Sequence, residues 1–121
     1  MARILIIDDE AMIRNLLVNI LEREGYETIT ATDGIDGIKI YRENPADLII
    51  TDLLMPEKDG LETIMELRRD SQDVKIIAMS GGGKIDPKTY LQIARTMGAI
   101  EIITKPFDLR ELLKTVQALL E

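Results

Sequence analysis

The sequence predicts an α/β protein with a doubly wound, five-stranded parallel sheet and helices on both of its faces. Five short aliphatic runs alternate with five segments of helical hydrophobic spacing, and short connections join them. The runs Arg3–Ile7, Leu48–Thr51 and Lys75–Met79 are nearly continuous in apolar residues instead of alternating. That pattern is typical of parallel strands that helices bury on both sides.

The first half of the chain contains two strands and two helices. The strand Arg3–Ile7 precedes a helix with an apolar stripe, followed by Gly25, a residue type typical of helix ends. After the second strand, Glu27–Ala31, Asp33 can cap a second helix that ends before Pro45. The two stripes are Ile13, Leu16, Leu17, Ile20 and Leu21 in the first helix and Ile35, Ile38 and Tyr41 in the second.

The second half repeats this alternation three times, with strands at Leu48–Thr51, Lys75–Met79 and Glu101–Thr104. The last helix is expected from about Leu109 to Leu120. Its start has capping-box spacing (Asp108 and Glu111) and staple spacing (Phe107 and Leu112). The stripes of the two preceding helices are Leu61, Ile64, Met65 and Leu67, and Leu91, Ile93, Ala94 and Met97.

Right-handed crossovers in such a chain favour the flavodoxin-like strand order 2-1-3-4-5, with ligands at the carboxyl ends of the strands. A length of 121 residues fits one domain, so we expect residues 1–121 to form a single domain without an output domain.

Composition excludes several classes of function. The chain has no Cys and no His, which excludes disulfides, thiolate zinc sites, imidazole ligands and Ser-His-Asp triads. A net charge of −7 argues against direct nucleic-acid binding. Nothing resembles a signal peptide, and no apolar run approaches the roughly 20 residues of a membrane span. We therefore expect a cytoplasmic protein without membrane insertion.

Residues that can carry chemistry gather at the predicted carboxyl edge of the sheet. Asp8 and Asp9 follow the first strand, and Asp52 follows the third. Ser80 follows the fourth strand, and Lys105 follows the fifth. Although they are scattered through the sequence, these five residues are expected to converge on one crevice.

Each of them also has a purely structural interpretation: Asp9 as a helix cap, Ser80 as a turn residue and Lys105 as a solvated surface charge. Together the three carboxylates are harder to explain in that way. Two like charges about 5 Å apart repel by roughly 3 kcal/mol at an effective dielectric constant near 20. A bound cation would offset this repulsion, and oxygen ligands favour Mg²⁺.

The motifs "IDDE", "DLIITDLLMPEKDG", "AMSG" and "TKPF", in this order and spacing, resemble the response-regulator receiver domains of two-component signalling. The resemblance covers essentially the whole chain. It implies a Mg²⁺ site, which Mn²⁺ could also occupy. Asp9, Asp52 and the backbone carbonyl of Leu54 would be direct ligands, and Asp8 would act largely through water.

The resemblance further implies that a histidine kinase or a histidine phosphotransfer protein phosphorylates Asp52. Ser80 would hydrogen-bond one phosphoryl oxygen and Lys105 would pair with another, and the Lys105–Pro106 peptide would be cis. The chain would be a signalling phosphoacceptor that promotes its own phosphorylation and dephosphorylation, not a classical enzyme. A downstream protein would read the change, with the chain a monomer or a phosphorylation-dependent dimer. Ile102 stands where the family often has a Tyr or Phe switch residue.

Three alternatives compete with this interpretation. "SGGGK" is not a P-loop, because Ala78 replaces the first glycine and Ile85 follows Lys84. A haloacid-dehalogenase-like phosphatase would need an acid two residues after its nucleophile, where Leu54 stands. The third alternative is a receiver-like interaction module that is not phosphorylated.

Overall fold

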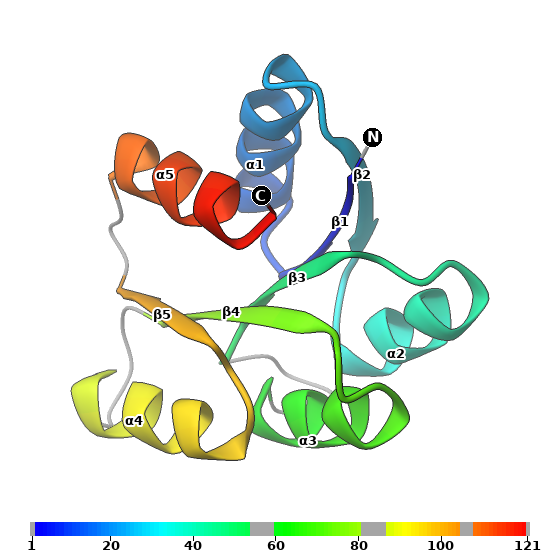
Figure 1. Cartoon of the computed structure of the whole chain (residues 1–121), viewed down its shortest axis with the longest axis vertical. Coiled ribbons are helices and arrows are strands. Elements are labelled where there is room, and N and C mark those ends of the chain that lie inside the picture. Colours follow the sequence, from blue (N-terminus) through cyan, green and yellow to red (C-terminus); the bar gives the residue numbers. More distant parts are fainter. Residues whose placement is uncertain (1, 54–59, 81–86, 105–107, 121) are drawn as a thin grey trace.

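The computed structural model describes residues 2–53, 60–80, 87–104 and 108–120 (Figure 1). In these ranges strands and helices alternate from the first element to the last. The strands are β1 (Arg3–Ile7), β2 (Glu27–Ala31), β3 (Leu48–Asp52), β4 (Lys75–Ser80) and β5 (Glu101–Thr104). The helices are α1 (Ala11–Arg23), α2 (Gly34–Glu43), α3 (Gly60–Asp70), α4 (Pro87–Met97) and α5 (Leu109–Leu120).

The sheet has the order β2-β1-β3-β4-β5, and every neighbouring pair of strands is parallel. The predicted fold class and strand order are therefore confirmed. The predicted bounds of β1, β2 and β5 match the structure, whereas β3 and β4 each run one residue farther, to Asp52 and Ser80. Two residues of the predicted site, Asp52 and Ser80, are therefore part of the sheet itself, because strand pairing continues to the last residue of β3 and of β4.

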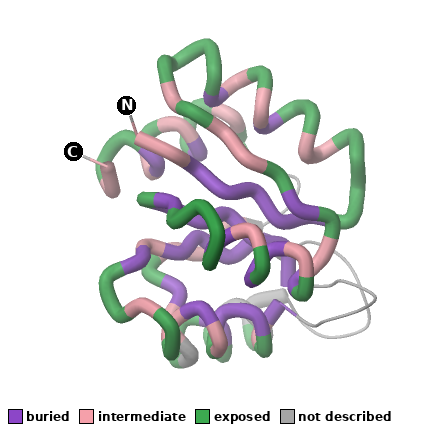
Figure 2. Tube along the Cα trace, turned by 90° about the vertical axis from the view of Figure 1, so that its right-hand side faces the viewer, coloured by how far each residue is buried: buried purple, intermediate pink, exposed green. Residues whose placement is uncertain are grey.

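Alternate strand residues build two hydrophobic layers, one on each face of the sheet. Leu5 and Ile7 belong to the layer covered by α2, α3 and α4, whereas Ile4 and Ile6 belong to the layer covered by α1 and α5. Figure 1 shows these two groups of helices on opposite sides of the sheet. The buried residues follow the strands through the middle of the molecule in Figure 2. The near-continuous apolar strands predicted this arrangement, because both of their faces are covered.

The predicted apolar stripes are too wide in four helices. Leu16, Ile35, Met65 and Ile93 were expected on buried helix faces, but each is between 39% and 57% exposed. Each of these helices lies on one side of the sheet, so residues at the margin of its stripe face solvent. Their neighbours Leu17, Ile38, Ile64 and Ala94 are buried as predicted.

Helix ends follow the predicted chemistry in most places. Gly25 has a φ of 92°, and the N–H groups of Gly25 and Tyr26 donate to the carbonyls of Glu22 and Leu21. This pairing is a Schellman motif, whose left-handed position favours glycine. At the start of α2, Asp33 Oδ1 accepts the N–H of Asp36 at 2.8 Å, which confirms the predicted cap.

The start of α5 differs from the predicted capping box. Asp108 Oδ1 accepts the N–H of Arg110 at 2.8 Å, so the bond reaches the second helical residue and not Glu111. The predicted staple partner Phe107 lies outside the described residues.

One exposed ion pair links two helices of the same layer. Arg42 Nε in α2 lies 2.7 Å from Asp70 Oδ2 at the end of α3. The hydrogen bond and charge of Asp70 raise the pKa of Arg42 above its ordinary value. Because the pair is exposed to solvent, it contributes little to stability and serves mainly to orient the two side chains.

Candidate functional site

Asp8 is fixed at the carboxyl end of β1, and it is fully buried. Its Oδ1 accepts the N–H of Glu10 at 2.9 Å, and Arg14 Nη1 donates to its backbone carbonyl at 2.7 Å. The backbone N–H of Asp8 donates to the carbonyl of Ala31 at 3.2 Å. These bonds hold both the main chain and the carboxylate of Asp8 between β1 and the start of α1.

Asp52 is the last residue of β3, and only 5% of it is exposed. Ile7 pairs with Thr51 across the neighbouring strands, so Asp8 and Asp52 are each the next residue along. Parallel strands lie about 4.8 Å apart, which brings the two acidic residues to adjacent positions at the same sheet edge. The hydroxyl of Thr51 donates to the carbonyl of Asp52 at 3.0 Å and helps to fix the strand end.

Helix α3 approaches the backbone of Asp52 very closely. A Cβ placed on Gly60 would lie 2.4 Å from the carbonyl oxygen of Asp52 and 2.5 Å from Cα of Leu53. The N–H of Gly60 donates to the carbonyl of Leu53 at 3.0 Å. Glycine is therefore required where α3 begins, because any side chain would push the helix away from the end of β3.

Three consecutive acids form the carboxylate cluster of the site. One carboxylate oxygen each from Asp8, Asp9 and Glu10 lies within 4.8 Å of the others. Glu10 was not among the predicted ligands, although the run "IDDE" already contained it. This set of hard oxygen donors fits Mg²⁺, which proteins bind through one or two carboxylates and several waters.

Asp9 is exposed and does not cap α1. The N-cap position belongs to Glu10, whose side chain makes no capping hydrogen bond. The structural interpretation of Asp9 as a helix cap is therefore wrong. Asp9 stands beside a buried carboxylate, and the fold does not use it to close the first turn of the helix.

The remaining predicted site residues are described in part or not at all. Met79 pairs with Asp52, so Ser80 stands one position beyond it at the end of β4, opposite Thr104 of β5. Leu54 and Lys105, together with the predicted cis peptide before Pro106, lie outside the described residues. The described part of the site therefore consists of the ends of β1, β3 and β4.

Comparison with known proteins decides the family. The sequence matches the response regulator receiver domain over residues 4–117. The chain belongs to this family. A solved structure of the chemotaxis protein CheY4 from Vibrio cholerae superposes with a TM-score of 0.87 at 32% identity and covers 98% of each chain. A receiver domain protein from Clostridium thermocellum gives a TM-score of 0.90 at 30% identity, with 98% of this chain and 94% of that chain covered.

Curated relatives of the receiver domain differ in length. Sporulation initiation phosphotransferase F of Bacillus subtilis is 31% identical, and the match covers 95% of this chain and 90% of that protein. The DNA-binding dual master transcriptional regulator RpaA of Synechocystis is 39% identical, but the match covers 99% of this chain and 49% of that protein. The chain thus spans about half the length of several curated relatives.

Family membership establishes the general role. The chain is a receiver domain of two-component phosphorelay signalling, a signalling module and not a classical enzyme. Receiver domains bind Mg²⁺ in an acidic pocket, and the cluster Asp8, Asp9 and Glu10 supplies acidic residues for one here. The family also implies a kinase or phosphotransfer partner. Among the described residues, no helix combines the length and the hydropathy that a membrane span requires.

Proposed function

We propose that this receiver domain accepts a phosphoryl group on Asp52 and that the product changes its contacts with other proteins. The observation that carries the proposal is the position of Asp52, which is nearly buried at the end of β3 and adjacent in register to Asp8. A carboxylate held beside another buried carboxylate favours a bound cation. Phosphoryl transfer from a phosphohistidine of the partner fits such a site, because the cation would neutralise the incoming phosphoryl oxygens.

In this phosphoryl transfer, Asp52 is the protein group that forms a covalent bond, and the rest of the site positions the reactants. An oxygen of the Asp52 carboxylate attacks phosphorus, the bond from phosphorus to the donor nitrogen breaks, and the electron pair stays on that nitrogen. Catalysis then consists mainly of alignment and charge stabilisation. The backbone bonds around Asp8, Thr51 and Gly60 contribute alignment, because they fix the ends of β1 and β3.

We assign the metal to the same edge of the sheet. Asp9, Asp52 and the backbone carbonyl of Leu54 would hold Mg²⁺ or Mn²⁺ directly, with Asp8 acting through water. A metal ion bound there would neutralise the negative charge of the phosphoryl oxygens. Ser80 and Lys105 would contact the remaining oxygens, one as a hydrogen-bond donor and the other as a cation. The burial of Asp8 and Asp52 supports this assignment, because a nearby cation offsets the cost of two buried carboxylates.

The proposed product adds negative charge to the site, and a downstream protein would read the resulting change. A cytoplasmic location and a monomer or phosphorylation-dependent dimer belong to the same proposal. An interaction module that is never phosphorylated is the competing function, and it predicts no chemical change at Asp52.

The test is incubation with acetyl phosphate and Mg²⁺, followed by intact mass and peptide mapping. We expect one phosphoryl group on Asp52, none after chelation of Mg²⁺, and none in Asp52→Asn, because an amide cannot form the acyl phosphate. Asp73→Asn is the matched control, since Asp73 is exposed and precedes β4 at the opposite end of the sheet. Labelling of Asp52→Asn would exclude Asp52, and no labelling of the wild type by acetyl phosphate or a kinase would favour the interaction module.

A further inference from the structure

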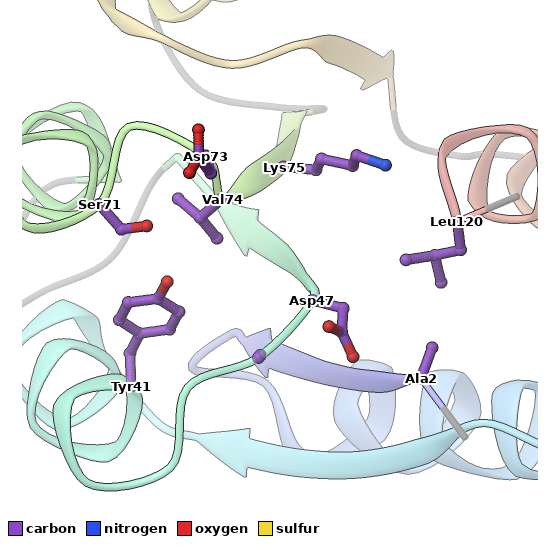
Figure 3. Close-up of a pocket in the computed structure, with 9 residues that line it drawn as sticks. Ala2, Tyr41, Asp47, Ser71, Asp73, Val74, Lys75 and Leu120 are labelled. Carbon is purple, nitrogen blue, oxygen red and sulfur yellow. The ribbon is translucent and has the colours of Figure 1, made fainter.

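A cavity lies at the amino edge of the sheet, at the opposite end of the strands from Asp8 and Asp52. Its volume is about 540 Å³. The walls come from the residues that precede β1, β3 and β4, from the end of α5 and from Tyr41 of α2 (Figure 3). Five segments that are distant in the sequence therefore meet there, and none of them takes part in the proposed phosphorylation.

Tyr41 directs a hydroxyl into this cavity. The residue is only 8% exposed, and its ring packs in the hydrophobic layer under α2 and α3. In Figure 3 the hydroxyls of Tyr41 and Ser71 point into the same space beside Val74. No hydrogen bond to the Tyr41 hydroxyl occurs among the described residues. The ring is buried while the hydroxyl itself opens on the cavity, because the Tyr41 hydroxyl is not one of the buried polar atoms that lack a partner among the described residues. A polar group of a ligand in the cavity can therefore reach the hydroxyl.

The charges of the cavity favour a cation. Asp47 and Asp73 both line it. Asp47 is fixed, because its Oδ2 accepts the N–H of Arg3 at 2.8 Å. Among the described residues that line the cavity, Lys75 is the one cation, and its Nζ donates to the backbone carbonyl of Leu119 in the last turn of α5. Its charge is thus directed to a helix end that carries partial negative charge and does not neutralise the two carboxylates.

The polar groups flank an apolar middle. Tyr41, Ser71 and Asp73 lie at one side of the cavity and Asp47 at the other, with Val74 between them (Figure 3). We propose that the cavity binds a short aliphatic diamine. One ammonium group contacts Asp73 and donates to the Tyr41 hydroxyl, the second contacts Asp47, and the alkyl chain lies over Val74.

The test is an NMR titration of the full chain with putrescine at neutral pH and physiological ionic strength, with Mg²⁺ at saturation to occupy the carboxyl-edge cluster. We expect saturable backbone shifts concentrated at Tyr41, Asp47 and Ser71–Lys75. Tyr41→Phe removes only the hydroxyl and keeps the ring, so the fold is retained. The lost hydrogen bond should weaken binding by roughly three- to tenfold.

Matched ligands and variants separate this site from general attraction to an acidic protein. Asp73→Asn should weaken binding at least as much as Tyr41→Phe, whereas Glu24→Gln, an equal charge change at an exposed residue outside the cavity, should not. Butylamine, with one ammonium group, and butanediol, with none, should bind more weakly than putrescine. Equal binding of butylamine and putrescine would overturn the proposal. Unchanged affinity in Tyr41→Phe and Asp73→Asn, or shifts that never saturate, would also overturn it.

Discussion

Gly60 is the residue at which α3 touches the strand of the proposed phosphoacceptor. Gly60→Ala would place a Cβ 2.4 Å from a backbone oxygen that cannot move without shifting β3. We expect the free energy of unfolding to fall by about 2 kcal/mol in urea melts, and phosphorylation to slow. Gly37→Ala is the comparison: its Cβ would lie 2.5 Å from Cδ1 and 2.9 Å from Cγ1 of Ile7. We expect a smaller loss there, because these atoms belong to a side chain that can turn and not to the backbone. A Gly60→Ala protein as stable as the wild type would contradict this.

The substitution Asp9→Asn tests whether repulsion among the three carboxylates lowers the stability of the metal-free protein. Asp9→Asn removes one of three neighbouring charges, and no cap is lost because the side chain of Asp9 does not cap α1. Since Asp9 and Glu10 are exposed, solvent reduces the repulsion, and we expect metal-free Asp9→Asn to be more stable by about 1 kcal/mol.

Urea melts with and without Mg²⁺ measure this effect. Added Mg²⁺ should stabilise the wild type more than Asp9→Asn, because the variant has lost a ligand. Glu24→Gln, which changes an exposed acid outside the cluster, should respond to Mg²⁺ as the wild type does. A clear loss of stability in metal-free Asp9→Asn would show that Asp9 supports the start of α1 in some other way.

Helices α3 and α4 are joined by one arginine. Arg68 donates from Nη2 to the carbonyl of Gly98 at 2.6 Å and from Nη1 to the carbonyl of Gln72 at 2.8 Å. Gly98 follows α4 with a φ of 135°, and a Cβ there would lie 3.0 Å from Nε of Arg68. The guanidinium thus fills the space beside a glycine and holds the C-terminal end of α4 against α3.

Loss of this link should loosen the end of α4. Arg68→Gln cannot reach both carbonyls, so we expect the free energy of unfolding to fall by about 1–2 kcal/mol. Amide exchange should also become faster at Gly98 and Ala99. Arg69→Gln is the matched control, since Arg69 is exposed on the same helix and has no ion pair among the described residues. Equal effects of the two substitutions would mean that the Arg68 hydrogen bonds contribute nothing measurable.

The sequence predicts most of this architecture because periodicity and residue type report on local burial. Continuous apolar runs revealed β1, β3 and β4, and the acids that follow β1 and end β3 marked the edge where Asp8 and Asp52 meet. Periodicity does not show how wide the contact of each helix is, so the exposure of Ile35 was missed. The Arg68 link to a loop and the cavity around the Tyr41 hydroxyl depend on how distant segments approach each other, and no local pattern encodes that approach.

Phosphorylation should act on this fold through one end of α4. Ile102, which stands at the position of the usual aromatic switch, packs partly buried against the hydrophobic layer under α2, α3 and α4. It has no polar tip to hydrogen-bond or ring to stack. Ser80 ends β4, and the next three residues in the sequence are glycines. Arg68 meanwhile fixes the other end of α4 through Gly98.

We therefore expect hydrogen exchange with and without stable phosphorylation to change mainly between Gly81 and Tyr90, a segment of which residues 81–86 lie outside the described structure. Protection at Arg95–Ala99 should stay nearly constant, because the Arg68 link and the bonds from Gly98 and Ala99 to the carbonyl of Ala94 hold that end. The change at Gly81–Tyr90 should largely disappear in Ser80→Ala, because this variant has no hydroxyl to be drawn to the phosphoryl group. Changes confined to β5 and α5 would refute this route and assign the switch to the face that Ile102 occupies.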